Sequence, residues 1–222
     1  MWQALHDEFQ SHDVDIISIA LDTPTGAAPW LEPLRSDSNL ALIDEALITV
    51  AAFGWVNVPS ALWFDETGTI VRGPEISFVK AKQPMAINDA ISAEQREMFD
   101  YINAFPHSGE AWLDALRDWV TRGAASRFAL PPREVVSRSR AHGIEQARAA
   151  AHYSMGEHLR AIDASAALAH FRRSHELDPE QWNRKRQAWA LHGGSEPFET
   201  TFLAEMRAYG ATSFYPEVNL DS

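Results

Sequence analysis

The pattern of hydrophobic and polar residues predicts that the chain begins with a helix followed by a strand. Trp2, Leu5 and Phe9 recur at the spacing of one helix face. Residues 14–21 (VDIISIAL) form a β-branched run of the length of a buried strand. Because the polar residues and the proline that follow cannot extend this run, we expect the strand to end at about residue 21.

The next segments predict a helix, a short strand and a second helix. The first helix is expected to begin near Gly26 and to carry Trp30 and Leu34. The apolar residues 39–44 (NLALID) predict a short strand, and residues 46–53 have a helical pattern. One helix is therefore expected between the two strands, and the other after the second strand.

Residues 60–73 have the pattern of a β-hairpin. The strand-like pieces SALWFD and TIVRG are joined by Glu66, Thr67 and Gly68. Gly68 lacks a side chain and can adopt the positive φ that a tight turn needs. The predicted order is helix, strand, helix, short strand, helix, strand, strand.

From about residue 85 onward the pattern is wholly helical. Gly123 suits the end of a helix, and Leu130-Pro131-Pro132 is the best linker candidate because prolines stop a helix and stiffen a connection. The expected helices cover residues 86–104, 110–123, 133–142, 144–160, 164–177, 180–191 and 197–209.

Charge differs between the two parts of the chain. Of a net charge of −12, residues 1–130 carry 8 Lys or Arg against 19 Asp or Glu (−11), and residues 131–222 carry 11 against 12 (−1). An acidic first part argues against nucleic acid and anionic membranes as partners, since both require clustered cations. The sequence has no long apolar run and no signal-peptide pattern, so we expect no membrane association and a cytoplasmic location.

The sequence contains no cysteine. This excludes disulfides, thiolate metal ligands and a thiol nucleophile from the chain itself.

Residues 54–75 (GWVNVPSALWFDETGTIVRGPE) place a proline in an apolar run just before a strand, where it removes a ladder hydrogen bond. Together with QALHDEF, VDIISIALD and LIDEALITVAAF, this stretch resembles the redoxin branch of the thioredoxin superfamily. That branch includes the TlpA- and ResA-like thiol-disulfide oxidoreductases and the alkyl hydroperoxide reductase and thiol-specific antioxidant proteins. The resemblance implies that Pro59 is cis and that the backbone of Val58 pairs with an extended substrate in a groove beside Trp55.

The chain departs from this family at its most important motif. The resemblance places the family's Cys-x-x-Cys motif and a central strand before residue 1, so neither is present. Three explanations stay open: Met1 is an internal start of a longer gene, the protein is a redox-dead relative, or a partner chain donates a strand. In each case we expect no thiol-disulfide exchange and no peroxide reduction by these 222 residues.

Residues 147–179 resemble a tetratricopeptide repeat. Gly156 falls at the close approach of two helices, and Ala167, Phe171, Ser174 and Pro179 follow at the repeat's spacing. Because one repeat cannot bury its own apolar face, we expect these helices to pack against flanking helices or against the first domain.

These observations predict an α/β protein in which a thioredoxin-like mixed sheet, lacking its first strand, precedes an all-α C-terminal region. The expected domains are residues 1–84 (thioredoxin-like), 85–130 (connecting helices) and 131–222 (the tetratricopeptide-like region). The alternative to a redoxin-like role is a non-catalytic scaffold that binds a protein or peptide partner through its helices.

Few other residues suggest chemistry. Asp22 follows a buried strand and could move protons there, although an Asp in this position more often caps the next turn. Trp55 and Trp63 flank the proline loop and could line an apolar groove. The nine histidines show no H-x-x-x-H spacing, and no phosphate-binding loop is present, so we expect no metal and no cofactor.

Overall fold

The computed structural model describes residues 2–32, 40–77, 85, 91–105, 109–140, 142–192 and 198–221. The protein is α/β, with short strands in its first part and helices throughout its second. The first part contains α1 (Trp2–Phe9), β1 (Ile17–Ala20), α2 (Pro24–Leu31), β2 (Leu40–Ile43), α3 (Ile48–Phe53), β3 (Ser60–Phe64) and β4 (Ile70–Ile76). Short 3-10 turns follow α1 (Gln10–His12) and α5 (Gly123–Ala125).

The second part contains α4 (Ala93–Asn103), α5 (Gly109–Arg122), α6 (Pro132–Arg138), α7 (Ile144–Leu159), α8 (Ala164–Leu177), α9 (Trp182–Leu191) and α10 (Phe202–Phe214). Side chains cap several of these helices: Ser92 and Gln95 form a capping box on α4, and Asp163 accepts the first free N–H groups of α8. The predicted helices are present, with shifted ends. The start predicted for α4 and residue Leu34 of the second predicted helix lie outside the described residues.

The strands form two separate sheets rather than the single mixed sheet that the sequence predicts. β1 pairs in parallel with β2, with Ile17 opposite Leu40, and β3 pairs antiparallel with β4, with Ser60 opposite Ile76. No strand of the described residues lies between β1 and β3.

The hairpin between β3 and β4 forms as predicted. Gly68 has a φ of 80°, and the carboxylate of Asp65 accepts the N–H groups of Thr67 and Thr69 across the turn. Within β4, Gly73 has a φ of 94° and precedes a cis bond to Pro74 that the sequence pattern did not indicate.

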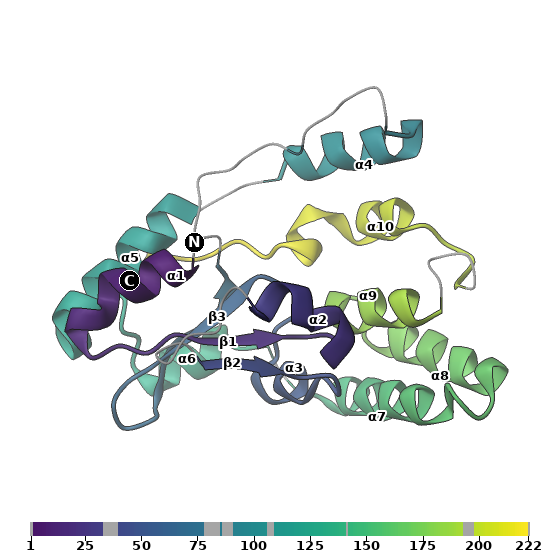
Figure 1. The fold of residues 1–222 in the computed structure, drawn as a ribbon, viewed down its shortest axis with the longest axis horizontal. Coiled ribbons are helices and arrows are strands. Elements are labelled where there is room, and N and C mark those ends of the chain that lie inside the picture. The colour runs from purple at the N-terminus through teal and green to yellow at the C-terminus, as the bar shows by residue number, and fades with distance from the viewer. Residues whose placement is uncertain are drawn as a thin grey trace.

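Three hydrophobic clusters hold these elements together, and each joins parts of the chain that are distant in sequence. The first packs α1 and β3 against α5, the second packs α3 against α7, α8 and α9, and the third packs α10 against α9 and the end of α4. Figure 1 shows the same arrangement: α1 lies beside α5 at one end of the molecule and α7, α8 and α9 lie at the other, with the strands between them. Each cluster crosses a boundary of the predicted domain division.

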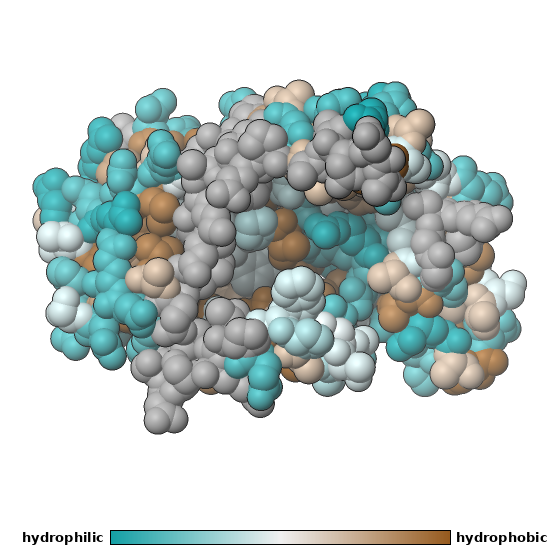
Figure 2. All heavy atoms as spheres, turned by 45° about the horizontal axis from the view of Figure 1, so that its top comes forward, coloured by the Kyte–Doolittle hydropathy of each residue, from teal (hydrophilic) through white to brown (hydrophobic). Residues whose placement is uncertain are grey.

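Figure 2 shows one face of the molecule, on which hydrophilic residues predominate among those coloured and hydrophobic residues appear as scattered patches, some in the central hollow and some at the edges.

The α7–α8 hairpin has the close helix approach expected at Gly156. A Cβ atom on this residue would lie 2.9 Å from the ring of Phe171, so only glycine fits without displacing the ring. The buried face of the hairpin, which includes Tyr153 and Phe171, packs in one cluster with Leu47, Val50 and Trp189. The hairpin therefore packs against a flanking helix and also against the first part of the chain, the two alternatives that the sequence left open.

Candidate functional site

A groove of about 1280 Å³ lies between the two sheets. Its strand residues are Ile17, Ser18 and Ile19 of β1 and all five residues of β3, whereas β2 and β4 contribute only Leu42 and Val71. The groove therefore lies along the sides of β1 and β3 that face away from their hydrogen-bonded partners. The helical side is formed by Phe9, Trp112, Leu116, Trp119 and Val120.

Large apolar side chains of the groove are unusually exposed. The exposed fraction is 55% for Ile17, 36% for Val58 and 44% for Phe64, and all three line the groove. Because apolar surface gathered in a concave site favours binding, these residues make the groove the leading candidate for a functional site.

The predicted proline loop forms one end of the groove. Val58, Pro59 and Trp55 all line it, and the Val58–Pro59 bond is cis, as the resemblance implies. Next to them Asn57 is fully buried; its amide nitrogen donates a hydrogen bond of 2.9 Å to the carbonyl oxygen of Phe214. This hydrogen bond fixes the loop to the last residue of α10.

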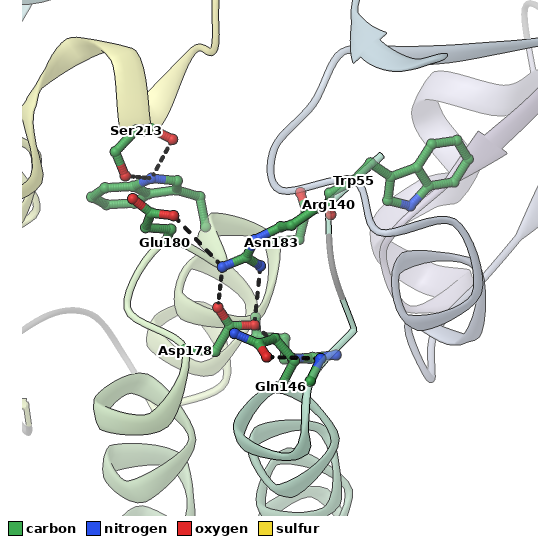
Figure 3. A network of polar contacts seen from close by, with 10 residues as sticks. Trp55, Arg140, Gln146, Asp178, Glu180, Asn183 and Ser213 are labelled. Atoms are coloured by element: carbon green, nitrogen blue, oxygen red, sulfur yellow. Dashed lines mark hydrogen bonds and ion pairs between the residues drawn. The ribbon is translucent and has the colours of Figure 1, made fainter. Parts of the chain in front are cut away.

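The first turn of α9 fixes the same loop. The backbone N–H of Asn183 donates to the carbonyl oxygen of Val56 (3.1 Å), and its side-chain amide donates to that of Trp55 (3.1 Å). Figure 3 shows the backbone of Trp55 near Asn183, with the indole pointing away from it. The side chain of Trp55 is therefore free to form a wall of the groove while its backbone is held.

Buried charges stabilise the turn that begins α9. Asp178, at the end of α8, accepts hydrogen bonds from Arg140 and from Arg184 (3.4 Å to Nη1), and Arg140 also lies 3.7 Å from Glu180. Figure 3 shows Arg140, Asp178 and Glu180 of this network close to Asn183. The network therefore fixes the segment just before α9, and Asn183 in the first turn of α9 holds the proline loop.

Two indole N–H groups in the groove lining have no acceptor. Trp55 Nε1 and Trp63 Nε1 are buried and form no hydrogen bond within the described part of the chain. Trp63 itself is 3% exposed, stacks on Trp119 at 5.1 Å and lies beneath the guanidinium of Arg72 at 5.4 Å. A buried donor without an acceptor costs about 1–3 kcal/mol, so these groups favour a ligand that supplies acceptors.

One end of the groove is acidic. Asp13 and Asp15 precede β1, Asp65 and Glu66 follow β3, and all four line the groove, whose lining includes no Lys or Arg. Hydrogen bonds from the Thr67 side chain and from the backbone N–H groups of Thr69 and Thr67 hold the pKa of Asp65 below its usual value. The carboxylate of Asp65 is therefore ionised at neutral pH.

Asp22 does not belong to this site. It is absent from the groove lining, and its carboxylate accepts the N–H of the adjacent Thr23 at 2.7 Å. The cap of α2 is the hydroxyl of Thr23, which accepts from the N–H of Gly26 at 3.1 Å. The stronger of the two sequence-based interpretations, a local structural role, agrees with these contacts, although Thr23 rather than Asp22 forms the cap.

The histidines include one pair that sequence spacing missed. Nδ1 of His152 in α7 lies 2.9 Å from Nδ1 of His170 in α8, because the pair forms between two helices and not along one. Burial, the charge of His170 and two nearby arginines lower the pKa of His152. No group of three or more His, Cys, Asp or Glu in metal-binding proximity occurs among the described residues.

The groove contains no recognisable catalytic arrangement. The hydroxyl of Ser60 donates to the carbonyl oxygen of Asn57 at 2.6 Å, and no Ser–His or Cys–His hydrogen bond is present in the lining as described. Its chemistry is that of a binding site: apolar walls, unpaired indole donors and one acidic end.

Comparison of the chain with protein-family models, curated proteins and solved structures returned no match. Among the described residues, no helix combines the length and the apolar character that crossing a bilayer requires.

Proposed function

We propose that this protein is a redoxin-like module without thiol chemistry, and that it binds an extended polypeptide segment in the groove between β1 and β3. The observation that carries this proposal is the groove itself, which is lined by exposed apolar side chains beside Val58 and Pro59. Its volume of about 1280 Å³ exceeds the roughly 300–1,000 Å³ of small-molecule pockets. A polypeptide fits this size better than a metabolite does.

The indole donors support a polypeptide as the ligand. A bound main chain carries one carbonyl acceptor at every residue. It could accept from Trp55 Nε1 and Trp63 Nε1, the two buried indole donors of the groove lining that lack partners. An apolar small molecule would leave both unpaired.

The alternative scaffold role of the helical region has less support. The inner faces of α7 and α8, including the fully buried Ala167 and Phe171, are covered by α3 and α9. In this proposal the helices hold the proline loop in place, and the partner binds at the groove.

Two measurements test the proposal. The purified chain is expected to bind a subset of peptides on an array of overlapping 12-residue segments of varied composition. It is expected to accelerate neither insulin-disulfide reduction nor peroxide consumption above the rate with dithiothreitol alone, since it has no cysteine.

Matched variants locate the binding surface. Val58→Glu places a charge in the groove, whereas Val136→Glu places the same charge on α6, where the side chain is 73% exposed and outside the groove lining. Peptide signals should disappear with Val58→Glu and persist with Val136→Glu. Equal signals from both variants, or no binding by the unsubstituted chain, would overturn the proposal.

A further inference from the structure

β1 and β3 each have one edge without a strand partner in the described part of the chain. β1 uses its other edge to pair with β2, and β3 uses its other edge to pair with β4. The groove is lined by both strands and contains almost nothing of β2 or β4. It is therefore bounded on its two sides by strand edges whose backbone groups can pair with another strand.

The two strands run in opposite directions. In Figure 1, β1 runs away from the end of the molecule that carries α1 and α5, whereas β3 runs toward that end and into the hairpin turn. A segment between them would lie parallel to one strand and antiparallel to the other. Both pairings are common in mixed sheets, so the geometry permits one strand to use both edges.

The groove is apolar above and below the plane of the strands. Ala61 and Trp63 of β3 pack in the cluster that contains Trp112 of α5. On the opposite face of β3, Phe64 lies against Phe53 of α3, with ring centroids 6.0 Å apart. A strand in the groove would bury both of its faces, and strands in that position are continuously apolar rather than alternating.

Length and charge define the segment further. The two edges are four and five residues long, so at about 3.3 Å per residue they match a strand of about five residues. The carboxylates of Asp13, Asp15, Asp65 and Glu66 lie at one end, because the start of β1 and the end of β3 meet there. Cationic residues next to the strand would complement that end.

We propose that the groove receives, between β1 and β3, one strand of about five consecutive apolar residues flanked by lysine or arginine, supplied by a separate partner protein. The strand pairs with both edges and joins the two sheets into one five-stranded mixed sheet. This inference rests on the proposed polypeptide-binding function, to which it adds the conformation, length and chemistry of the ligand.

The probe is a fluorescein-labelled peptide with five apolar residues between lysines, KKVIVIVKK, added to the full chain and followed by fluorescence anisotropy. A peptide with proline at the centre, KKVIPIVKK, keeps the charge but cannot complete the backbone ladder, and it should bind at least tenfold more weakly. The acidic peptide EEVIVIVEE should also bind more weakly, and Asp13→Asn with Asp15→Asn should weaken KKVIVIVKK by about two- to fivefold.

Hydrogen exchange distinguishes this inference from the broader function. With KKVIVIVKK bound, amides in both Ile17–Ala20 and Ser60–Phe64 should gain protection. Protection of only one of these strands, or equal affinity for the proline peptide, would overturn strand insertion while leaving polypeptide binding intact. If neither KKVIVIVKK nor any array peptide binds, the proposed function fails as well.

Ile17→Glu and Val136→Glu provide a matched pair for the same assay, because both side chains are exposed and only Ile17 lines the groove. The first variant should weaken KKVIVIVKK at least tenfold and the second should bind it as the unsubstituted chain does. The reverse result would place the peptide elsewhere on the molecule.

Discussion

Arg186 of α9 donates a hydrogen bond of 3.1 Å to Oδ1 of Asn57, the oxygen that also accepts the N–H of Val58 at 3.0 Å. The amide nitrogen of Asn57 donates to the carbonyl oxygen of Phe214. One buried side chain therefore links two C-terminal helices to the loop that forms an end of the groove. The shape of the groove depends on residues that follow it by more than a hundred positions.

Replacing Asn57 by alanine should destabilise the protein. Asn57→Ala leaves the buried carbonyl oxygen of Phe214 without its donor and removes an acceptor of the exposed Arg186, and we expect the free energy of unfolding to fall by about 1–3 kcal/mol. Urea denaturation measures the change. Asn219→Ala is the control: its exposed side chain should matter by less than about 0.5 kcal/mol. Similar losses for both variants would contradict the role of Asn57.

The contact between Gly156 and Phe171 predicts an overpacked variant. Gly156→Ala places a methyl group 2.9 Å from the Phe171 ring, and the resulting strain should cost about 1–3 kcal/mol despite the better helix propensity of alanine. Ser154→Ala, at an exposed position of the same helix, should not destabilise. Phe171→Leu should cost less in the Gly156→Ala background than alone, as a double-mutant cycle by thermal unfolding would show.

Arg72 should be essential for the packing of the C-terminal residues. Its side chain is 1% exposed, pairs with Glu75 at 2.7 Å and donates to the carbonyl oxygens of Phe128 (3.2 Å) and Asn219 (2.7 Å). Arg72→Met removes the donor from the largely buried carboxylate of Glu75 and from the buried carbonyl oxygen of Phe128, so we expect a loss of about 3 kcal/mol in unfolding free energy.

Arg122→Met provides the comparison for Arg72→Met. The Arg122 side chain is exposed and pairs with Asp118 at 3.4 Å, and removal of this pair should change stability by less than about 0.5 kcal/mol. Chemical denaturation of both variants measures the two changes in unfolding free energy. If Arg72→Met were as stable as Arg122→Met, the buried contacts of Arg72 would contribute nothing.

Stability should fall as the pH drops below about 6.5. Burial, with a smaller contribution from the charge of Lys185, lowers the pKa of His175 to about 3. Below about pH 6.5 the unfolded chain binds a proton at His175, whereas the folded chain does not. The contribution of His175 to the free energy of unfolding is therefore complete above about pH 6.5 and is lost as the pH falls toward 3. The expected slope is about 1.4 kcal/mol per pH unit.

Urea denaturation between pH 7 and pH 5 measures this slope before most carboxylates titrate. Replacement by an uncharged residue, His175→Gln, removes the group that titrates and should flatten the slope. An unchanged slope in His175→Gln would assign the acid sensitivity to other groups, such as His152 and His192, whose pKa values burial also lowers.

Local patterns predicted the elements of the fold well. The spacing of Trp2, Leu5 and Phe9 predicted α1, and the turn at Gly68 predicted the β3–β4 hairpin, because both signals depend on neighbouring residues. The division into two sheets was not predicted. Strand pairing joins residues far apart in the sequence, and the edge of β1 carries no local signal of what lies beside it.

The candidate site was predicted in part. Trp55, Val58 and Pro59 were expected to lie together and do line one groove, since they are close in sequence. The contacts of Asn183 and Arg186 with that loop were missed, as was the acidic end formed by Asp15 and Asp65. Such contacts form only when segments distant in sequence come together. The sequence pattern around a charged helical residue is the same whether its side chain faces solvent or a buried loop.

Val50 of α3 is fully buried in a cluster whose remaining members lie mostly beyond residue 150. A fragment that ended at the two prolines after Leu130 would expose to water the face of α3 that is buried in the whole chain. Such a fragment would tend to self-associate, and a peptide affinity measured with it would reflect non-specific hydrophobic binding rather than specific binding in the groove. The shortest piece of the molecule in which ligand binding can be studied therefore extends through α10.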